Sequence, residues 1–136
     1  MNGYHTAMLN QVALISVGAA LGAIARWLLG QGLNEMFPSI PPGTLAANLI
    51  GGYLIGIMME ALAAPLALAP ELRLLVITGF LGGLTTFSTF SAEVARLVQQ
   101  GRLALAGMEI FAHVAGSVTL TILGIATVMA ARRWMA

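Results

Sequence analysis

Hydrophobic residues dominate four stretches of the sequence, and polar or helix-breaking residues separate them. The apolar stretches cover residues 8–29, 44–64, 72–98 and 103–131. A helix needs about 20 residues to cross roughly 30 Å of hydrocarbon, and each stretch is near or above that length. Turns are expected between the first three stretches, where prolines gather: Pro38, Pro41, Pro42, Pro65 and Pro70. The pattern predicts an all-α membrane protein with four transmembrane helices in a single domain, residues 1–136.

The third stretch contains an unusual run, GFLGGLTTFSTF, at residues 79–90. Each glycine inside a helix costs about 0.5–1 kcal/mol relative to alanine. Ser and Thr side chains can also bond nearby backbone groups instead of continuing the helical ladder. We therefore predict that the glycines at residues 79–83 let this helix break in the middle of the membrane. Such breaks free backbone carbonyls, which coordinate Na⁺ in other membrane proteins.

Composition supports a membrane protein and excludes several classes of function. The chain is 59% hydrophobic and 8% charged, whereas a soluble domain is about 25% charged. A net charge of +1 gives no basic footprint for nucleic acid. The absence of cysteine excludes disulfides and thiolate chemistry. The two histidines and five glutamates show no recognisable spacing of side-chain metal ligands.

The positive charges bear on membrane orientation. With four spans, Arg73, Arg132 and Arg133 lie near one side of the membrane and Arg26, Arg96 and Arg102 near the other. An excess of cations on one side normally fixes orientation, and three against three supplies none. The balance predicts insertion in both orientations and assembly as an antiparallel pair. Charge counting alone leaves a single orientation open.

Polar residues inside the apolar stretches need partners other than lipid. For any one hydroxyl, a bond to its own helix or a neighbouring helix suffices, at about 1 kcal/mol. The whole set is too large for one small bundle, which favours a polar pathway or a partner subunit. Its members are Asn48, Thr78, Thr85, Thr86, Ser88, Thr89, Ser91, Glu93, Glu109, His113, Ser117, Thr119 and Thr121.

Phe87 and Phe90 are three residues apart and share one face if the helix resumes after Thr85. Phenylalanine rings have a positive edge and a negative face. Ring edges, hydroxyl protons and the amide of Asn48 would favour a small anion, whereas ring faces would favour a cation. Ordinary packing of the two rings remains the alternative.

Glu109, His113 and Ser117 follow each other at four-residue spacing and form one stripe on the fourth helix. A hydrolytic triad needs a base, an orienting group and an oxyanion hole that converge on one point. Three residues stacked along one helix converge poorly, so we do not expect an enzyme. A proton relay or a polar pore lining fits the stripe better.

Three motifs resemble the Fluc (CrcB) fluoride channel family. They are GFLGGLTTFSTF at residues 79–90, GTLAANLIGGYLIG at 43–56 and GAIARW at 22–27. The resemblance implies a four-helix chain that forms an antiparallel, dual-topology homodimer in the cell membrane. It further implies passive export of fluoride from the cytoplasm through two pores, and a structural sodium ion at the dimer interface where the third helices break.

The resemblance also assigns roles to particular residues. Asn48, Phe87 and Phe90 match the pore residues that contact fluoride. The main-chain carbonyls of Gly82 and Thr85 match the sodium ligands. Further matches are Ser88, Thr89 and Ser117 in the polar surroundings of the pores, Arg26 in the vestibule and Glu93 just beyond the motif. Glu109 and His113 depart from the family, which would place neutral polar residues there.

Two other hypotheses for the function are an exporter and an accessory protein. A small dual-topology multidrug-type exporter would exchange protons for a cation through a carboxylate in its first helix. Residues 8–29 contain no carboxylate, so only Glu93 or Glu109 could substitute. An accessory membrane protein without transport activity would use its polar residues only for interhelical hydrogen bonds.

Overall fold

The computed structural model describes residues 2–37, 40–62 and 69–135, and within these ranges its regular structure is entirely helical. The helices are α1 (Asn2–Leu33), α2 (Pro42–Leu62), α3 (Pro70–Arg73), the π-helix η1 (Leu74–Leu81), α4 (Gly82–Leu84), α5 (Phe87–Gln99) and α6 (Leu103–Met135). Pro38, Pro65 and the end of the second predicted span, residues 63–64, lie outside the described residues.

Four helical segments are long and apolar enough to cross a membrane. They are Tyr4–Leu33, Pro42–Leu62, Pro70–Gln99 and Leu103–Met135. The predicted all-α membrane class is therefore confirmed. The first and last helices extend past the apolar stretches into their polar ends, because a helix satisfies its own backbone wherever no residue breaks it.

The third segment is interrupted at Thr85 and Thr86, which both have extended backbones (φ −82°, ψ 153° and φ −149°, ψ 119°). The Thr86 side chain then caps α5 by accepting a hydrogen bond from the Thr89 N–H at 3.2 Å. The glycines predicted to break the helix are themselves helical, in η1 and α4. The break thus begins one residue after α4 ends, and its depth in the bilayer remains a prediction.

The glycines before the break serve close packing against α1. A Cβ added at Gly18 would lie 2.8 Å from the Phe80 nitrogen, and one at Gly22 would lie 2.7 Å from the Leu84 nitrogen. From the other side, a Cβ at Gly79 would lie 2.9 Å from the Gly18 Cα. Small residues on both helices let the backbones approach this closely. Gly18 and Gly22, four residues apart on α1, thus mediate a close contact between helices.

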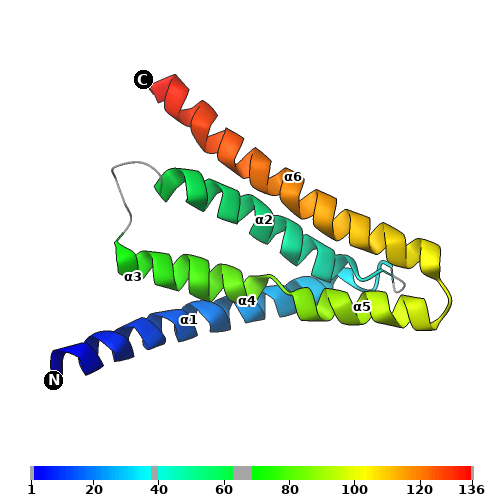
Figure 1. Ribbon diagram of the computed structural model, residues 1–136, viewed down its shortest axis with the longest axis horizontal. Helices are drawn as coiled ribbons and strands as arrows, with labels where there is room; N and C mark the ends of the chain where they lie inside the picture. The colour runs from blue at the N-terminus through cyan, green and yellow to red at the C-terminus, as the bar shows by residue number, and fades with distance from the viewer. Residues whose placement is uncertain (1, 38–39, 63–68, 136) are drawn as a thin grey trace.

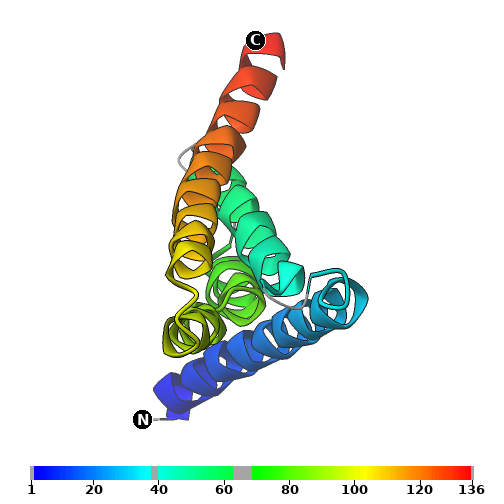
Figure 2. The same ribbon diagram turned by 90° about the vertical axis from the view of Figure 1, so that its right-hand side faces the viewer.

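The helices converge at one end and spread at the other. Figure 1 shows both chain ends at the left, where α1 and α6 diverge, and the end-on view of Figure 2 shows the same separation. In Figure 1, α2 lies between α6 and the interrupted helix. The α2–α6 contact also relies on glycine, since a Cβ at Gly124 would lie 2.9 Å from the Ile57 nitrogen. A small buried cluster, Ala47, Leu81 and Leu84, joins α2 to the segment just before the break.

Candidate functional site

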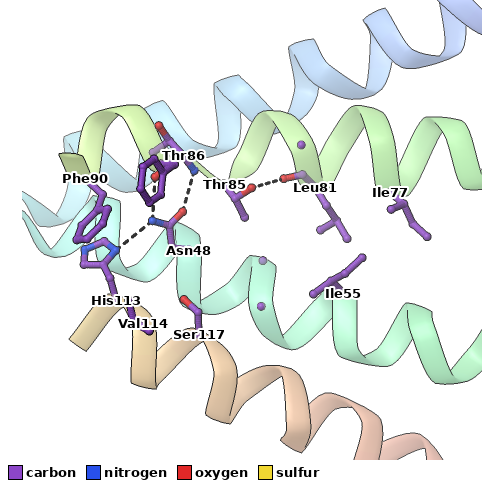
Figure 3. A pocket seen from close by; sticks show the side chains of 14 residues that line it. Asn48, Ile55, Ile77, Leu81, Thr85, Thr86, Phe90, His113, Val114 and Ser117 are labelled. Atoms are coloured by element: carbon purple, nitrogen blue, oxygen red, sulfur yellow. Dashed lines mark hydrogen bonds between the residues drawn. The ribbon is translucent and has the colours of Figure 1, made fainter. Parts of the chain in front are cut away.

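Asn48 of α2 forms hydrogen bonds with the backbone of Thr86, where the third helix is interrupted. The Thr86 N–H donates to Asn48 Oδ1 at 2.8 Å, and Asn48 Nδ2 donates to the Thr86 carbonyl at 3.0 Å. One side chain thus pairs both polar backbone groups of a buried residue outside the helices, groups that would otherwise be costly to bury. Figure 3 shows this pair of bonds beside the cavity described below.

The same bonds fix the orientation of the Asn48 amide and the tautomer of His113. Because Nδ2 must face the Thr86 carbonyl, its second hydrogen is directed to His113 Nδ1, 3.1 Å away. His113 Nδ1 is therefore an acceptor, and a neutral imidazole then carries its proton on Nε2. The His113 ring is 4% exposed and stacks on Phe90, with centroids 4.6 Å apart.

Phe87 and Phe90 meet edge to face, with centroids 5.6 Å apart and planes at 65°. Their environments differ sharply: Phe90 is 8% exposed, whereas Phe87 is 79% exposed. The two rings are in contact in the first turn of α5, but only Phe90 is covered by this chain. The ring edge that an anion would meet is thus available on a surface that a second molecule could cover.

A cavity of about 470 Å³ lies beside the break. Its walls include apolar side chains such as Ile55, Ile77 and Leu81. It also brings together six residues that the sequence singled out from three separate helical segments: Asn48, Gly82, Thr85, Phe87, Phe90 and Ser117. Four of the six predicted pore residues therefore share one cavity with the predicted sodium ligands, whereas Ser88 and Thr89 do not line it.

A second cavity, of about 370 Å³, approaches the break from the side of α1. Arg26, Glu35, Thr44 and Thr89 line it, and Thr86 lines both cavities. The Arg26 guanidinium donates through Nε to the Gly83 carbonyl at 3.1 Å. Arg26 and Thr89 are thus separated from the Phe87–Phe90 cavity by the extended backbone itself.

Two hydroxyls connect with Thr86 at the start of α5. Ser88 Oγ lies 3.2 Å from Thr86 Oγ1, and Thr86 Oγ1 donates to Thr89 Oγ1 at 3.0 Å. Ser88 is exposed and Thr89 is half-buried. With the first N–H groups of α5 beside them, these hydroxyls form the positive end of a half-helix, an arrangement that favours an anion.

The break leaves particular carbonyls without their helical donors. The Thr86 N–H, which would bond the Gly82 carbonyl in a continuous helix, goes to Asn48 at 2.8 Å instead. The Thr89 N–H, which would bond the Thr85 carbonyl, goes to Thr86 Oγ1 at 3.2 Å. Gly82 is exposed, and a Cβ there would meet little of this chain. Both predicted sodium ligands thus have oxygens available for another partner.

The structure also assembles a cluster that the sequence did not predict. One ligating atom from each of Glu93, Glu109 and His113 lies within 4.8 Å of the others. Glu93 comes from α5 and the other two from α6, so no spacing in the sequence could indicate the group. Glu109 and His113 are four residues apart, which shows only that these two share one face of α6. Thr44 contacts the cluster, donating to Glu93 Oε1 at 2.7 Å.

Thr86 is the central residue that sequence reasoning placed only in the general polar set. The one available signal was a threonine directly before the point where the helix resumes, because threonine is among the residues preferred at an N-cap. Its bonds to Asn48 depend on the placement of α2 and could not be read from the sequence.

Comparison with known proteins agrees with the motifs. A family model described as CrcB-like protein, Camphor Resistance (CrcB), matches residues 13–125. A protein of Tolumonas auensis is 64% identical over 126 residues, which cover 93% of this chain and 99% of the relative. A relative from Chromobacterium violaceum is 56% identical over 120 residues, covering 88% of this chain and 95% of the relative. One from Nitrosomonas europaea is 54% identical over 121 residues, covering 89% and 95%.

These three relatives carry the name fluoride-specific ion channel FluC. Together with the four apolar helices, the similarity makes this chain a multi-pass protein of the cell membrane. The family model covers most of the chain, and the relatives match along nearly their whole length. The chain therefore belongs to the CrcB family.

Proposed function

We propose that this protein is a fluoride channel that lets fluoride leave the cytoplasm passively. The observation that carries the proposal is the start of α5, where hydroxyls, helix N–H groups and the Phe90 ring meet beside a cavity of about 470 Å³. Fluoride is strongly hydrated, so several donors must replace its water at one place. The names of the relatives support the same ion, and a channel needs no catalytic group.

Asn48 has an indirect role in this proposal. Both hydrogens of its amide are engaged, one with the Thr86 carbonyl and one with His113. In this arrangement Asn48 holds the backbone of Thr86 in its extended form. Ser88 and the first turn of α5 supply donors to the ion, and Thr89 supplies one from the second cavity. A direct bond from Asn48 to fluoride would require that it release His113.

The functional unit in this proposal is an antiparallel homodimer. Phe87 is 79% exposed although it belongs to the site, and a second copy would cover it. The three-to-three arginine balance suits chains that insert in both orientations. Two chains would then form two pores, each with one Phe87 and one Phe90 supplied at the contact.

A sodium ion at the centre of the dimer completes the proposal. The carbonyls of Gly82 and Thr85 have lost their helical donors, and Gly82 faces away from its own chain. Two carbonyls from each copy would give the ion four oxygens of the kind that Na⁺ binds at broken helices. The ion would hold the interrupted helices together without carrying current.

Fluoride efflux from proteoliposomes, followed with a fluoride electrode, tests the function. We expect fast release that needs no proton gradient and that leaves chloride behind. Phe90→Ile, which removes the ring edge but keeps an apolar side chain, should reduce release by about tenfold, the loss of roughly one good interaction. Phe111→Ile, an exposed ring on α6, is the matched control. Proton-coupled export of an organic cation would instead support the multidrug-type exporter, and no flux of any ion would support an accessory role.

A further inference from the structure

The cluster of Glu93, Glu109 and His113 is buried without the partners its charges would need. Glu109 is 0% exposed and His113 is 4% exposed. Among the described residues, both oxygens of Glu109, Oε2 of Glu93 and Nε2 of His113 have no hydrogen-bond partner. The donor that reaches the carboxylates is Thr44, at 2.7 Å from Glu93 Oε1.

Among the described residues, one cation acts on the charge of Glu93 and none acts on that of Glu109. Arg96 follows Glu93 by one turn on α5 and is exposed. On the other packed elements, Arg26 of α1 bonds Gly83, and Glu60 of α2 pairs with Arg132 of α6 at 3.0 Å. Glu35, just after α1, is an acidic residue that lines the smaller cavity together with Thr44. Two carboxylates this close in a medium of low dielectric constant do not both ionise. The cluster must hold either a proton or a metal ion.

The hydrogen bonds of Asn48 decide between these two. Thr86 fixes the Asn48 amide, and the amide donates to His113 Nδ1 at 3.1 Å. The neutral imidazole therefore carries hydrogen on Nε2 and has no lone pair there for a metal. Metal-bound histidines have the opposite arrangement, with the second nitrogen donating. The cluster as built is suited to a proton.

We propose that Glu93 and Glu109 bind one proton between them, held by Glu109, at the border of the ion pathway. Thr44 donates to Glu93 and so stabilises the charge there, whereas no donor from the described part of the chain reaches Glu109. The site touches both cavities, because His113 lines the larger one and Thr44 the smaller one. This role rests on the proposed channel function: the bound proton neutralises one carboxylate, so a passing fluoride meets one negative charge instead of two.

Infrared spectroscopy tests the proton without reference to transport. A protonated carboxylic acid has a C=O stretch that a carboxylate lacks, and the chain has five acidic side chains, so its spectrum is simple. At neutral pH we expect this band in the wild type and in Glu93→Gln, and its loss in Glu109→Gln. Glu71→Gln, at an exposed position, is the control. A wild type without the band, or a purified protein with one bound metal ion per chain, would overturn the proposal.

Fluoride efflux against pH then tests the consequence. As the pH rises and the proton leaves, a second charge near the path should slow wild-type efflux by about tenfold. Glu109→Gln cannot gain that charge and should keep its efflux at alkaline pH. An identical alkaline loss in both proteins contradicts the proposal. If neither protein moves fluoride at any pH while the infrared band is present, the channel function fails and the proton site stands.

Discussion

At the scale of single residues, the site depends on an exchange of hydrogen bonds at the break. Asn48 takes both polar backbone groups of Thr86, which frees the carbonyl of Gly82 for another partner. The Thr86 hydroxyl in turn takes the Thr89 N–H, which frees the carbonyl of Thr85. Asn48 also sets the tautomer of His113, which stacks on Phe90. The side-chain amide of Asn48 thus connects the extended backbone at Thr86 with His113, which belongs to the acidic cluster and stacks on Phe90.

Replacing Asn48 should therefore affect folding as well as flux. Asn48→Ala leaves the Thr86 N–H and carbonyl buried and unpaired, at a cost of about 1–3 kcal/mol for each group. Asn48→Asp keeps the acceptor for the Thr86 N–H but places a negative oxygen against the Thr86 carbonyl. We expect both variants to unfold at lower temperature in detergent and to lose fluoride efflux. Asn34→Ala is the control for stability alone, because it also loses a hydrogen bond between a side-chain amide oxygen and a backbone N–H, that of Gly43.

The two phenylalanines should respond differently to the oligomeric state. Phe87 has little contact with its own chain, so Phe87→Ile should leave the stability of the separated chain nearly unchanged while reducing efflux in the assembled protein. Phe90→Ile removes a buried ring and its contact with His113, and most destabilising single substitutions cost about 0.5–3 kcal/mol. Thermal unfolding of both variants, measured beside efflux, separates these effects. Equal destabilisation by the two changes would contradict the assignment of Phe87 to an intermolecular surface.

At the scale of helices, much of the fold followed from the sequence because lipid imposes a simple rule. Every backbone group must be satisfied within a spanning segment, so long apolar runs become helices. The exact position of the break did not follow, because glycines 79 and 83 are held in helices by close packing against α1. The threonines after them lose helical geometry once Asn48 offers better partners. The proximity of Glu93 to Glu109 also could not be predicted from the sequence, since it depends on how α5 crosses α6.

The close contact of α1 with η1 and α4 should be intolerant of a single methyl group. Gly22→Ala places a Cβ within 2.7 Å of the Leu84 nitrogen, so the helices must separate. We expect lower thermal stability and a weaker Arg26–Gly83 bond, read out as reduced efflux. Gly107→Ala in α6 is the matched control, because a Cβ there meets nothing within 4 Å and should stabilise the helix by about 0.5–1 kcal/mol. Equal tolerance at both positions would show that the α1 contact is looser than described.

At the scale of the whole molecule, one chain leaves much apolar and aromatic surface uncovered. Large exposed side chains run along α1 and α6, and the two helices diverge toward the chain termini. Lipid can cover most of this surface, but it cannot satisfy the free carbonyls of Gly82 and Thr85. The proposed antiparallel dimer would satisfy them through a shared sodium ion.

Orientation can be measured directly because the chain contains no cysteine. Single cysteines at Tyr4 and at Met135, both exposed, would be labelled with a membrane-impermeant thiol reagent from either side of the membrane. Dual insertion predicts that each position is labelled about halfway from outside and fully after permeabilisation. Complete protection or complete labelling from outside would establish one orientation and exclude the antiparallel pair.

Sodium removal should weaken the assembly rather than the pore chemistry. We expect replacement of Na⁺ by a large organic cation to lower the thermal stability of the dimer and to slow efflux. Thr85→Pro, which distorts the carbonyl geometry, should abolish this dependence on sodium, whereas Thr119→Ala, at an exposed residue of α6, should keep it. Stability that is independent of sodium would leave the Gly82 and Thr85 carbonyls without the proposed ligand.

The interruption at Thr85 and Thr86 also divides the chain mechanically. The part before it, η1 with α4, packs mainly on α1, whereas α5 packs mainly on α6 and is tied to α2 through Asn48. The two halves of the third span thus pack on different helices, and two extended residues join them. A small rotation of α1 would move the Arg26 cavity relative to the phenylalanines without unwinding either half. The one membrane span whose sequence predicted a break is therefore also the place where two separately packed parts of the chain meet.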